Sequence, residues 1–365
     1  MDKITIVIPS YNPNVNLTML VDELLLAGIN DIIIVDDGSN LEDKKVQMAY
    51  AYVREKEACT LIHHGTNMGK GTALKTGFKY CLLNRPKDRL IITVDDDGQY
   101  GIECIQQCIE KYKEMYDEIY AEHGEPPVLL GSRKFSDSGY KIIKRIVNYI
   151  CGFVMKYMCF VKVRDVQTGL RLIPHRYLYD LLKVDGHGFD YEINMLPEMK
   201  YKNIPYAEVT IQIEQVNGQY ADYNPMRDVL KCLGVMIRYV FSSLSATALD
   251  VIVFYLFLMM FDSGVLPLDK SFGMLYATVI ARVISATYNC IINKKAVFKS
   301  DAPMKSIIIR FYVFSLAKAV MSYAMTLAFS YLMGSYADSM TVVVKLVVDL
   351  ILFFGGYGIQ KKWIF

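Results

Sequence analysis

The sequence predicts two parts: an α/β domain built on a parallel sheet, and an all-α membrane domain of four helices. Short β-branched runs alternate with helical patterns over roughly the first 100 residues, as in parallel α/β sheets. Long apolar segments follow residue 232. Lys and Arg number 28 against 32 Asp and Glu in residues 1–232, but 12 against 6 in residues 233–365. This asymmetry indicates a soluble domain, residues 1–232, joined to a membrane domain, residues 233–365.

The N-terminal part contains four expected strands, at 4–9, 32–37, 60–64 and 90–97, separated by expected helices at 15–27, 42–57 and 71–84. In doubly wound sheets, ligands bind beyond the carboxyl ends of the strands. Polar side chains stand at three of these ends: Asn12, the pair Asp36 and Asp37, and the run from Asp95 to Asp97. We therefore expect them to share one crevice.

Four apolar segments, at about 239–261, 272–292, 307–333 and 341–360, are each long enough to cross a hydrocarbon core of about 30 Å. The connection between the second and third is rich in lysine, and the other two connections are net negative. By the positive-inside rule, the lysine-rich connection and both chain ends are cytoplasmic. The sequence thus predicts a multi-pass protein of the cell (plasma) membrane with a cytoplasmic N-terminal domain.

Four charged residues, one from each expected span, lie within the apolar segments: Asp250, Arg282, Lys318 and Asp349. An isolated charge at the bilayer centre costs at least about 2.5 kcal/mol, so we expect these side chains to face the bundle interior or reach an interface. Two interpretations stay open. The charges pair to fix helix packing, or they line a polar path for a lipid-linked headgroup.

Residues 140–164 interleave basic with apolar side chains. This pattern predicts interfacial helices, apolar towards lipid and cationic towards headgroups. The alternative is an ordinary amphipathic helix that covers the sheet. The membrane domain that follows favours contact with the bilayer.

Composition and cysteine usage exclude several classes of protein. Hydrophobic residues make up 53% of the chain and charged residues 21%, which excludes a disordered protein. The eight cysteines form no CxxC pair and no zinc-like cluster, as expected in a reducing compartment. The N-terminal apolar run is too short for a signal peptide. No nucleic-acid partner is expected.

The central motif is DDDGQY, residues 95–100, at the end of an expected strand. Asp95 and Asp97 fall on one face of an extended segment, and with the Gln99 amide they suit a hard divalent ion that also binds phosphate. Such an ion would neutralise a diphosphate leaving group. The alternative is an acidic turn that caps a helix. The position after a buried strand favours the metal.

Two further segments suggest contacts with a nucleotide. The acids of DDGS, residues 36–39, can accept hydrogen bonds from a base or ribose, although the same residues also form turns. In NMGKG, residues 67–71, the glycines permit close backbone approach and Lys70 supplies charge for a phosphate. The spacing is not that of a P-loop.

Together these stretches resemble the family 2 glycosyltransferases, which have the GT-A (Rossmann-like) fold. The matching motifs are VIPSYN (7–12), IIVDDGS (33–39), NMGKGTAL (67–74), VDDDGQY (94–100) and GSR (131–133). VRDVQTGLRLIP (163–174), GFDYE (188–192) and NPMRD (224–228) are similar to the branch of dolichol-phosphate mannose synthases and bacterial polyprenyl-phosphate glucosyltransferases. RYVFSSLSATALD (238–250), RVISATYNCIINKKAVF (282–298) and KLVVDLILFFGGYGIQKKWIF (345–365) resemble the small four-span GtrA-like family.

The resemblance implies roles for particular residues. Asp97, Asp165 and Arg133 would be catalytic, with Asp165 as an orienting or electrostatic group. Asp95, Asp97 and Gln99 would hold Mg²⁺ or Mn²⁺. The donor would contact Pro9, Tyr11, Asp36, Asp37, Lys70, Asp95 and Asp96, where Asp96 replaces a common Ala without consequence. The acceptor phosphate would meet Arg133, Gln167 and Arg227.

These features predict a membrane-bound inverting glycosyltransferase. It would move a hexose from UDP-glucose or UDP-N-acetylglucosamine, with GDP-mannose left open, to a polyprenyl phosphate such as undecaprenyl phosphate for cell-envelope glycans. A lipid phosphate is already anionic, so no strong base is required. The rivals are a processive polysaccharide synthase, although the chain lacks a QxxRW segment in its first domain, and a lipid-linked-sugar flippase with a sugar-loading domain. Homo-oligomerisation is left open.

Overall fold

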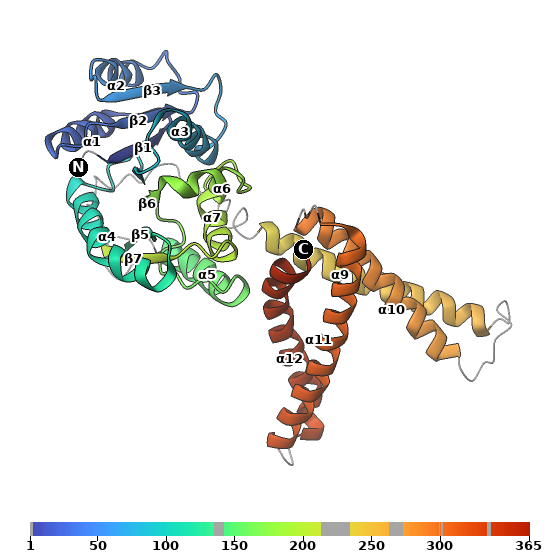
Figure 1. The fold of residues 1–365 in the computed structure, drawn as a ribbon. Coiled ribbons are helices and arrows are strands. Elements are labelled where there is room, and N and C mark those ends of the chain that lie inside the picture. Colours follow the sequence, from blue (N-terminus) through green and yellow to red (C-terminus); the bar gives the residue numbers. More distant parts are fainter. Residues whose placement is uncertain are drawn as a thin grey trace. The chain divides into compact units, whose positions relative to one another are not determined.

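A computed structural model gives the conformation of residues 3–134, 142–212, 234–262, 273–298, 300, 302–333 and 337–365. The chain divides into two compact units, Met1–Cys232 and Leu233–Phe365. The first unit contains a sheet with helices packed on it, and the second is helical (Figure 1).

The first unit is built on a seven-stranded sheet in the order β3-β2-β1-β4-β6-β5-β7. Its strands are β1 (Ile4–Ser10), β2 (Ile32–Asp36), β3 (Cys59–His63), β4 (Leu90–Thr93), β5 (Val128–Arg133), β6 (Arg171–Pro174) and β7 (Tyr206–Ile211). The four strands predicted from the sequence are parallel to one another. Strand β6 runs antiparallel to both β4 and β5, so the complete sheet is mixed.

Helices cover both faces of the sheet. They are α1 (Val15–Leu26), α2 (Lys44–Arg54), α3 (Lys70–Asn84), α4 (Ile102–His123), α5 (Ile142–Met158), α6 (Leu178–Leu182) and α7 (Asp190–Tyr201). Alternate strand residues such as Ile6 and Ile34 share one apolar core with α1, α2 and α4. On the other face α3 crosses β1 so closely that a Cβ at Gly77 would lie 2.5 Å from Val7 Cγ1. The sheet is therefore buried on both sides, which explains its continuous apolar runs.

Strand β4 ends at Thr93, four residues before the predicted end. The acids from Asp95 to Asp97 lie in a turn that Gly98 continues with φ of +79°, a conformation that favours glycine. Adjacent carboxylates repel one another in a buried ladder, so the chain leaves the sheet where they begin. The prediction that Asp95 and Asp97 share the face of a strand is therefore wrong.

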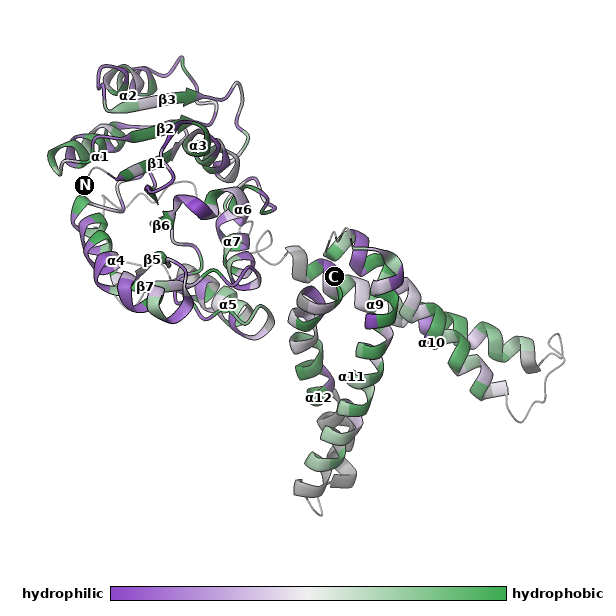
Figure 2. Cartoon of the chain, in the orientation of Figure 1, coloured by the Kyte–Doolittle hydropathy of each residue, from purple (hydrophilic) through white to green (hydrophobic). Residues whose placement is uncertain are grey.

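The second unit contains α9 (Gly234–Asp262), α10 (Gly273–Ile292), α11 (Met304–Met333) and α12 (Ala337–Ile359), and Figure 2 shows that these helices are largely hydrophobic. Over the described residues, three segments are long and apolar enough to span a membrane: Ile237–Met260, Leu275–Val297 and Met304–Phe329. The fourth predicted span is represented by a shorter apolar helix, Val347–Ile359. Four spans are thus not confirmed.

The helices of this unit form two hairpins that are joined through corresponding residues. Helix α10 continues into a π-helical turn with the sequence NKKAV, and α12 continues into one with the sequence QKKWI. Asn293 Nδ2, which begins the first turn, donates to Oε1 of Gln360, which begins the second, over 3.2 Å and 67 residues of sequence. Phe298 stacks on Phe365, also its counterpart, with ring centroids 4.8 Å apart. Contacts between equivalent positions are the mark of a two-fold arrangement, so we describe this unit as an internal repeat.

Each hairpin also contains a polar pair, and one member of each pair occupies a corresponding position. Arg282 Nη1 lies 3.5 Å from Asp250 Oδ2 in the first hairpin. Asp349, the counterpart of Arg282, accepts a hydrogen bond from Ser322 in the second, over 2.5 Å. These contacts favour the interpretation that the charges in the apolar helices fix packing.

The junction between the hairpins predicts a stability difference. Gln360 accepts from Asn293 and donates to the Tyr239 hydroxyl over 2.8 Å, and all three side chains are buried. Replacing Gln360 with Leu leaves the Asn293 amide and the Tyr239 hydroxyl without this hydrogen-bond partner. We therefore expect the free energy of unfolding in detergent to fall by about 2 kcal/mol. Tyr239→Phe removes one hydrogen bond and should lower the thermal midpoint less. The exposed change Ile359→Val is the control, and equal midpoints for all variants would contradict this account.

Candidate active site

The acidic turn after β4 is tied to the neighbouring strand. Ser10, the last residue of β1, donates from Oγ to Asp96 Oδ2 over 2.6 Å. Burial, together with the charges of Asp97 and Asp95, raises the pKa of Asp96 to about 7. Asp96 thus ties the turn to β1, and the expectation that it replaces a smaller residue without consequence stays a prediction.

Asp97 and Gln99 contact each other across the same turn. Gln99 Nε2 donates to Asp97 Oδ2 over 2.6 Å, and the Gln99 backbone N–H donates to Oδ1 over 3.1 Å. Burial and the charge of Asp95 raise the pKa of Asp97 to about 6. A carboxylate whose charge is disfavoured in this way gains from a nearby cation.

The turn fits a cation that it would share with a substrate. Within the described residues, no group of three His, Cys, Asp or Glu side chains is arranged to hold a metal ion. Asp95 and Asp97 offer only oxygen, and Asp97 is crowded by the charge of Asp95. Mg²⁺ and similar ions are commonly held by one or two carboxylates together with substrate phosphates. The residues present therefore suit a divalent ion completed by a diphosphate.

Lys70 lies beside this turn, between two carboxylates. Its Nζ is 2.7 Å from Asp95 Oδ1 and 2.9 Å from Oε2 of Glu192 on α7. Burial disfavours the ammonium, but the two carboxylates more than offset this and raise the pKa of Lys70. Glu192 was not predicted as a site residue, although it ends the GFDYE stretch.

Asp36 and Asp37 are engaged by protein groups. Asp36 accepts from the Ser39 backbone and lies 2.8 Å from Nδ1 of His63. Burial opposes its charge, but the contacts with Ser39 and His63 hold the pKa of Asp36 below its usual value. Asp37 accepts from the backbone N–H groups of Met68 and Gly69, over 3.0 and 2.7 Å. The pair therefore ties β2 to the loop before Lys70.

The two predicted site residues of the first motif, VIPSYN (7–12), lie in different surroundings. Pro9 is buried inside β1, opposite Val35 of β2. Tyr11, just beyond the strand, is 50% exposed. Of these two residues, both predicted to contact the nucleotide, Tyr11 is therefore the one with an exposed surface.

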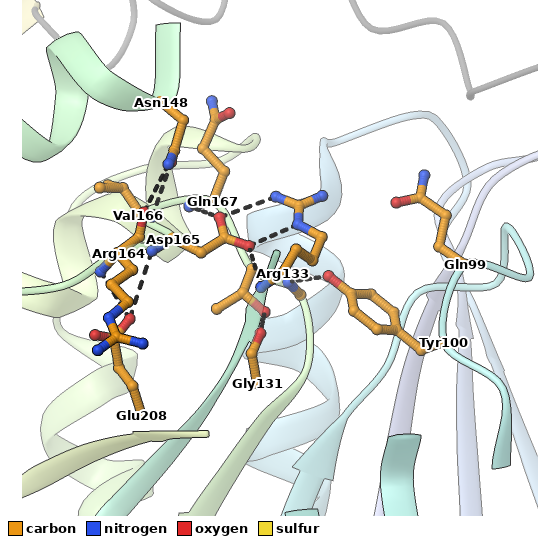
Figure 3. Close-up of polar contacts among 12 residues, drawn as sticks. Gln99, Tyr100, Gly131, Arg133, Asn148, Arg164, Asp165, Val166, Gln167 and Glu208 are labelled. Atoms are coloured by element: carbon orange, nitrogen blue, oxygen red, sulfur yellow. Dashed lines mark hydrogen bonds and ion pairs between the residues drawn. The ribbon is translucent and has the colours of Figure 1, made fainter. Parts of the chain in front are cut away.

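Arg133 and Asp165 form a two-point ion pair (Figure 3). Arg133 Nε is 2.6 Å from Asp165 Oδ2, and Nη2 is 3.0 Å from Oδ1. Asp165 is fully buried and also accepts from the Gln167 backbone N–H over 3.1 Å. The buried carboxylate of Asp165 holds Arg133 in place, and the orienting or electrostatic role expected of Asp165 stays a prediction.

A cavity of about 730 Å³ opens beside Arg133, between α5 and the segment that ends at Arg164. Among the described residues that line it, one side chain is acidic, Glu208, and six are basic: Arg133, Lys134, Arg145, Lys156, Lys162 and Arg164. Glu208 is engaged by the backbone N–H of Arg164, over 2.8 Å. The cavity is therefore a cationic site. Arg227, the remaining predicted phosphate contact, lies outside the described residues.

Helix α5 combines this cationic wall with an apolar surface. Ile146, Tyr149, Phe153 and Tyr157 are each between 48% and 74% exposed. Large exposed apolar side chains that gather on one helix mark an interaction surface. The described part of α5 has the pattern expected of the interfacial segment at 140–164, of which residues 140 and 141 lie outside the described residues, and contact with a bilayer stays a prediction.

Comparison with known proteins adds the family. Residues 5–169 match the family described as Glycosyl transferase family 2, and residues 238–365 match the one described as GtrA/DPMS, transmembrane domain. The chain is 25% identical over 242 residues to a dolichyl-phosphate beta-glucosyltransferase of Dictyostelium discoideum, which covers 60% of this chain and 68% of that protein. The corresponding human enzyme is 24% identical over 233 residues, covering 59% and 68%.

Solved structures show more distant likenesses. Mannosyl-3-phosphoglycerate synthase from Rubrobacter xylanophilus aligns with a TM-score of 0.49 and 12% identity, over 65% of this chain and 73% of that one. A mannosyltransferase from Pyrobaculum calidifontis, in complex with GDP-Man and Mn²⁺, aligns with a TM-score of 0.38 and 10% identity, over 99% and 87%. From the two family matches and the mixed α/β sheet, the chain is a glycosyltransferase that joins a glycosyl transferase family 2 domain of GT-A-like fold to a GtrA/DPMS transmembrane domain.

Proposed function

We propose that this glycosyltransferase moves glucose from UDP-glucose to a polyprenyl phosphate at the cytoplasmic surface of a membrane, with inversion at the anomeric carbon. The observation that carries the proposal is the cationic cavity beside Arg133. Its volume and six basic side chains suit a phosphate headgroup, which forms strong charge-assisted hydrogen bonds with Arg and Lys. The names of the dolichyl-phosphate beta-glucosyltransferases support the same acceptor class and sugar.

The surface of α5 explains how a lipid would reach the cavity. The exposed aromatic and aliphatic side chains of α5 suit the boundary between headgroups and acyl chains, and its basic residues suit the headgroups. A prenyl chain can therefore stay in the membrane while its phosphate enters the protein. A water-soluble sugar acceptor would need neither feature.

The proposed reaction does not require a strong general base. A lipid monophosphate carries negative charge at neutral pH, so its oxygen can attack the anomeric carbon directly. The protein must hold that oxygen in line and stabilise the departing diphosphate. Asp165 holds Arg133 towards the cavity by its two-point contact, and Arg133 neutralises phosphate charge. A divalent ion at Asp95 and Asp97, when bound, would neutralise the diphosphate leaving group.

The donor and acceptor are tested with the purified full-length chain, undecaprenyl phosphate, and radiolabelled UDP-glucose, UDP-N-acetylglucosamine or GDP-mannose in separate reactions. We expect label in the organic extract from UDP-glucose alone, because the product is a single sugar on a lipid. Label that stays in a high-molecular-weight polymer would instead indicate a processive synthase. Transfer from another donor would contradict the assignment of UDP-glucose.

Removal of one metal-binding charge tests the acidic turn. Asp97→Asn keeps the shape of the side chain but removes its charge, and we expect kcat to fall about a hundredfold or more. Asp88→Asn is the matched control, because Asp88 is exposed and paired with Lys3 away from the turn. If the unaltered enzyme is equally active in excess EDTA and in Mn²⁺, the metal assignment is wrong.

The cationic cavity makes a different prediction. Lys156→Gln and Lys162→Gln each remove one positive charge from its wall, so the KM for undecaprenyl phosphate should rise about tenfold, the loss of one charge-assisted contact. The KM for UDP-glucose should not change. Lys183→Gln, an exposed lysine at the end of α6, serves as the control. An unchanged KM for undecaprenyl phosphate in both cavity variants would contradict the proposal that the acceptor phosphate binds in this cavity.

A further inference from the structure

Lys70 occupies a position that the neighbouring segment enforces. It is the first residue of α3, between Gly69 and Gly71. A Cβ at Gly69 would lie 2.3 Å from the His187 carbonyl oxygen, and one at Gly71 would lie 2.4 Å from Tyr191 Cβ. The loop before α7 therefore presses directly on both neighbours of Lys70, which needs glycine on either side.

The same loop is fastened to α3 beyond these contacts. The Thr72 backbone N–H donates to the His187 carbonyl over 3.0 Å, and Lys75 Nζ donates to the Gly186 carbonyl over 3.0 Å. The Phe189 ring lies 5.2 Å from the Lys70 ammonium. The start of α3 and the start of α7 thus form one packed unit, and Glu192 has a fixed place within it.

This geometry gives the Lys70 ammonium two alternative anionic partners. It is shared between Asp95 in the acidic turn and Glu192 behind it, and the Glu192 side chain is 3% exposed. A buried ammonium left without an anion is strongly disfavoured. Because Glu192 remains in place, Lys70 can release Asp95 and still keep an ion pair.

We propose that Lys70 is an internal counter-ion that competes with the divalent ion for Asp95, and that Glu192 sets the strength of this competition. The inference rests on the metal part of the proposed function. When a divalent ion binds Asp95, the ammonium moves onto Glu192. Lys70 therefore weakens metal binding, whereas Glu192 strengthens it although it is not itself a ligand.

The two residues predict opposite effects on metal affinity, measured without any nucleotide sugar. The readout is the dissociation constant for Mn²⁺, from the EPR signal of unbound Mn²⁺, with the full-length chain in detergent. Lys70→Met should bind Mn²⁺ about tenfold more tightly, because Asp95 loses its competitor. Glu192→Gln should bind about tenfold more weakly, a size typical of residues that act behind metal ligands, because Lys70 then depends on Asp95 alone.

Lys79→Met is the matched control, since this lysine is exposed on the same helix, and its Mn²⁺ affinity should not change. Lys70→Gln should act like Lys70→Met and replaces it if that variant unfolds. Weaker binding in both the Lys70 and Glu192 variants would show a purely structural pair and overturn the inference. If the unaltered chain binds Mn²⁺ but Lys70→Met binds no more tightly, the inference alone fails. If the unaltered chain binds Mn²⁺ neither alone nor in the presence of UDP, which supplies the diphosphate, the metal part of the proposed function fails with it.

Discussion

Three consecutive carboxylates at the end of β4 set the main electrostatic constraint on the first unit. They cannot all remain charged and close together without compensation, since each raises the free energy of its ionised neighbours. Each of the three carboxylates is contacted by a different part of the structure. Ser10 of β1 donates to Asp96, Lys70 of α3 contacts Asp95, and the turn itself supplies the amide that contacts Asp97. The contacts that stabilise these carboxylates therefore also hold β1 and α3 to the turn.

The other half of the site follows the same principle with the signs reversed. Here the excess charge is positive, and the buried carboxylate of Asp165 fixes one guanidinium while the remaining basic side chains line an open cavity. A negative turn and a positive cavity lie at the ends of neighbouring parts of one sheet. Such an arrangement suits a reaction in which one phosphate is brought in and another departs, because each group meets charge of the opposite sign.

The sequence predicted what is local and missed what depends on distant partners. The first four strands and their parallel order follow from apolar runs and turn residues, and the structure agrees. The antiparallel β6 could not be foreseen, because a short run such as RLIP carries no signal of direction. Glu192 was missed because its partner Lys70 lies far away in the sequence, and only the packing of α3 against α7 brings them together. For Asp165 the sequence suggested an orienting or electrostatic role, and its burial, which cannot be read from a motif, comes from the structure.

The membrane unit shows the same limit in another form. NKKAVF and QKKWIF are visible in the sequence, but six-residue likenesses are weak until Asn293 is seen to contact Gln360. Corresponding positions can carry opposite charges, because Arg282 in one hairpin occupies the position that Asp349 occupies in the other. Each contacts a residue on the adjacent helix of its own hairpin, whereas the described contacts at the junction involve neutral amides and aromatic rings. Neutral amides and aromatic rings need only hydrogen bonds and packing, so among the described residues the two hairpins meet at this junction without an ion pair between them.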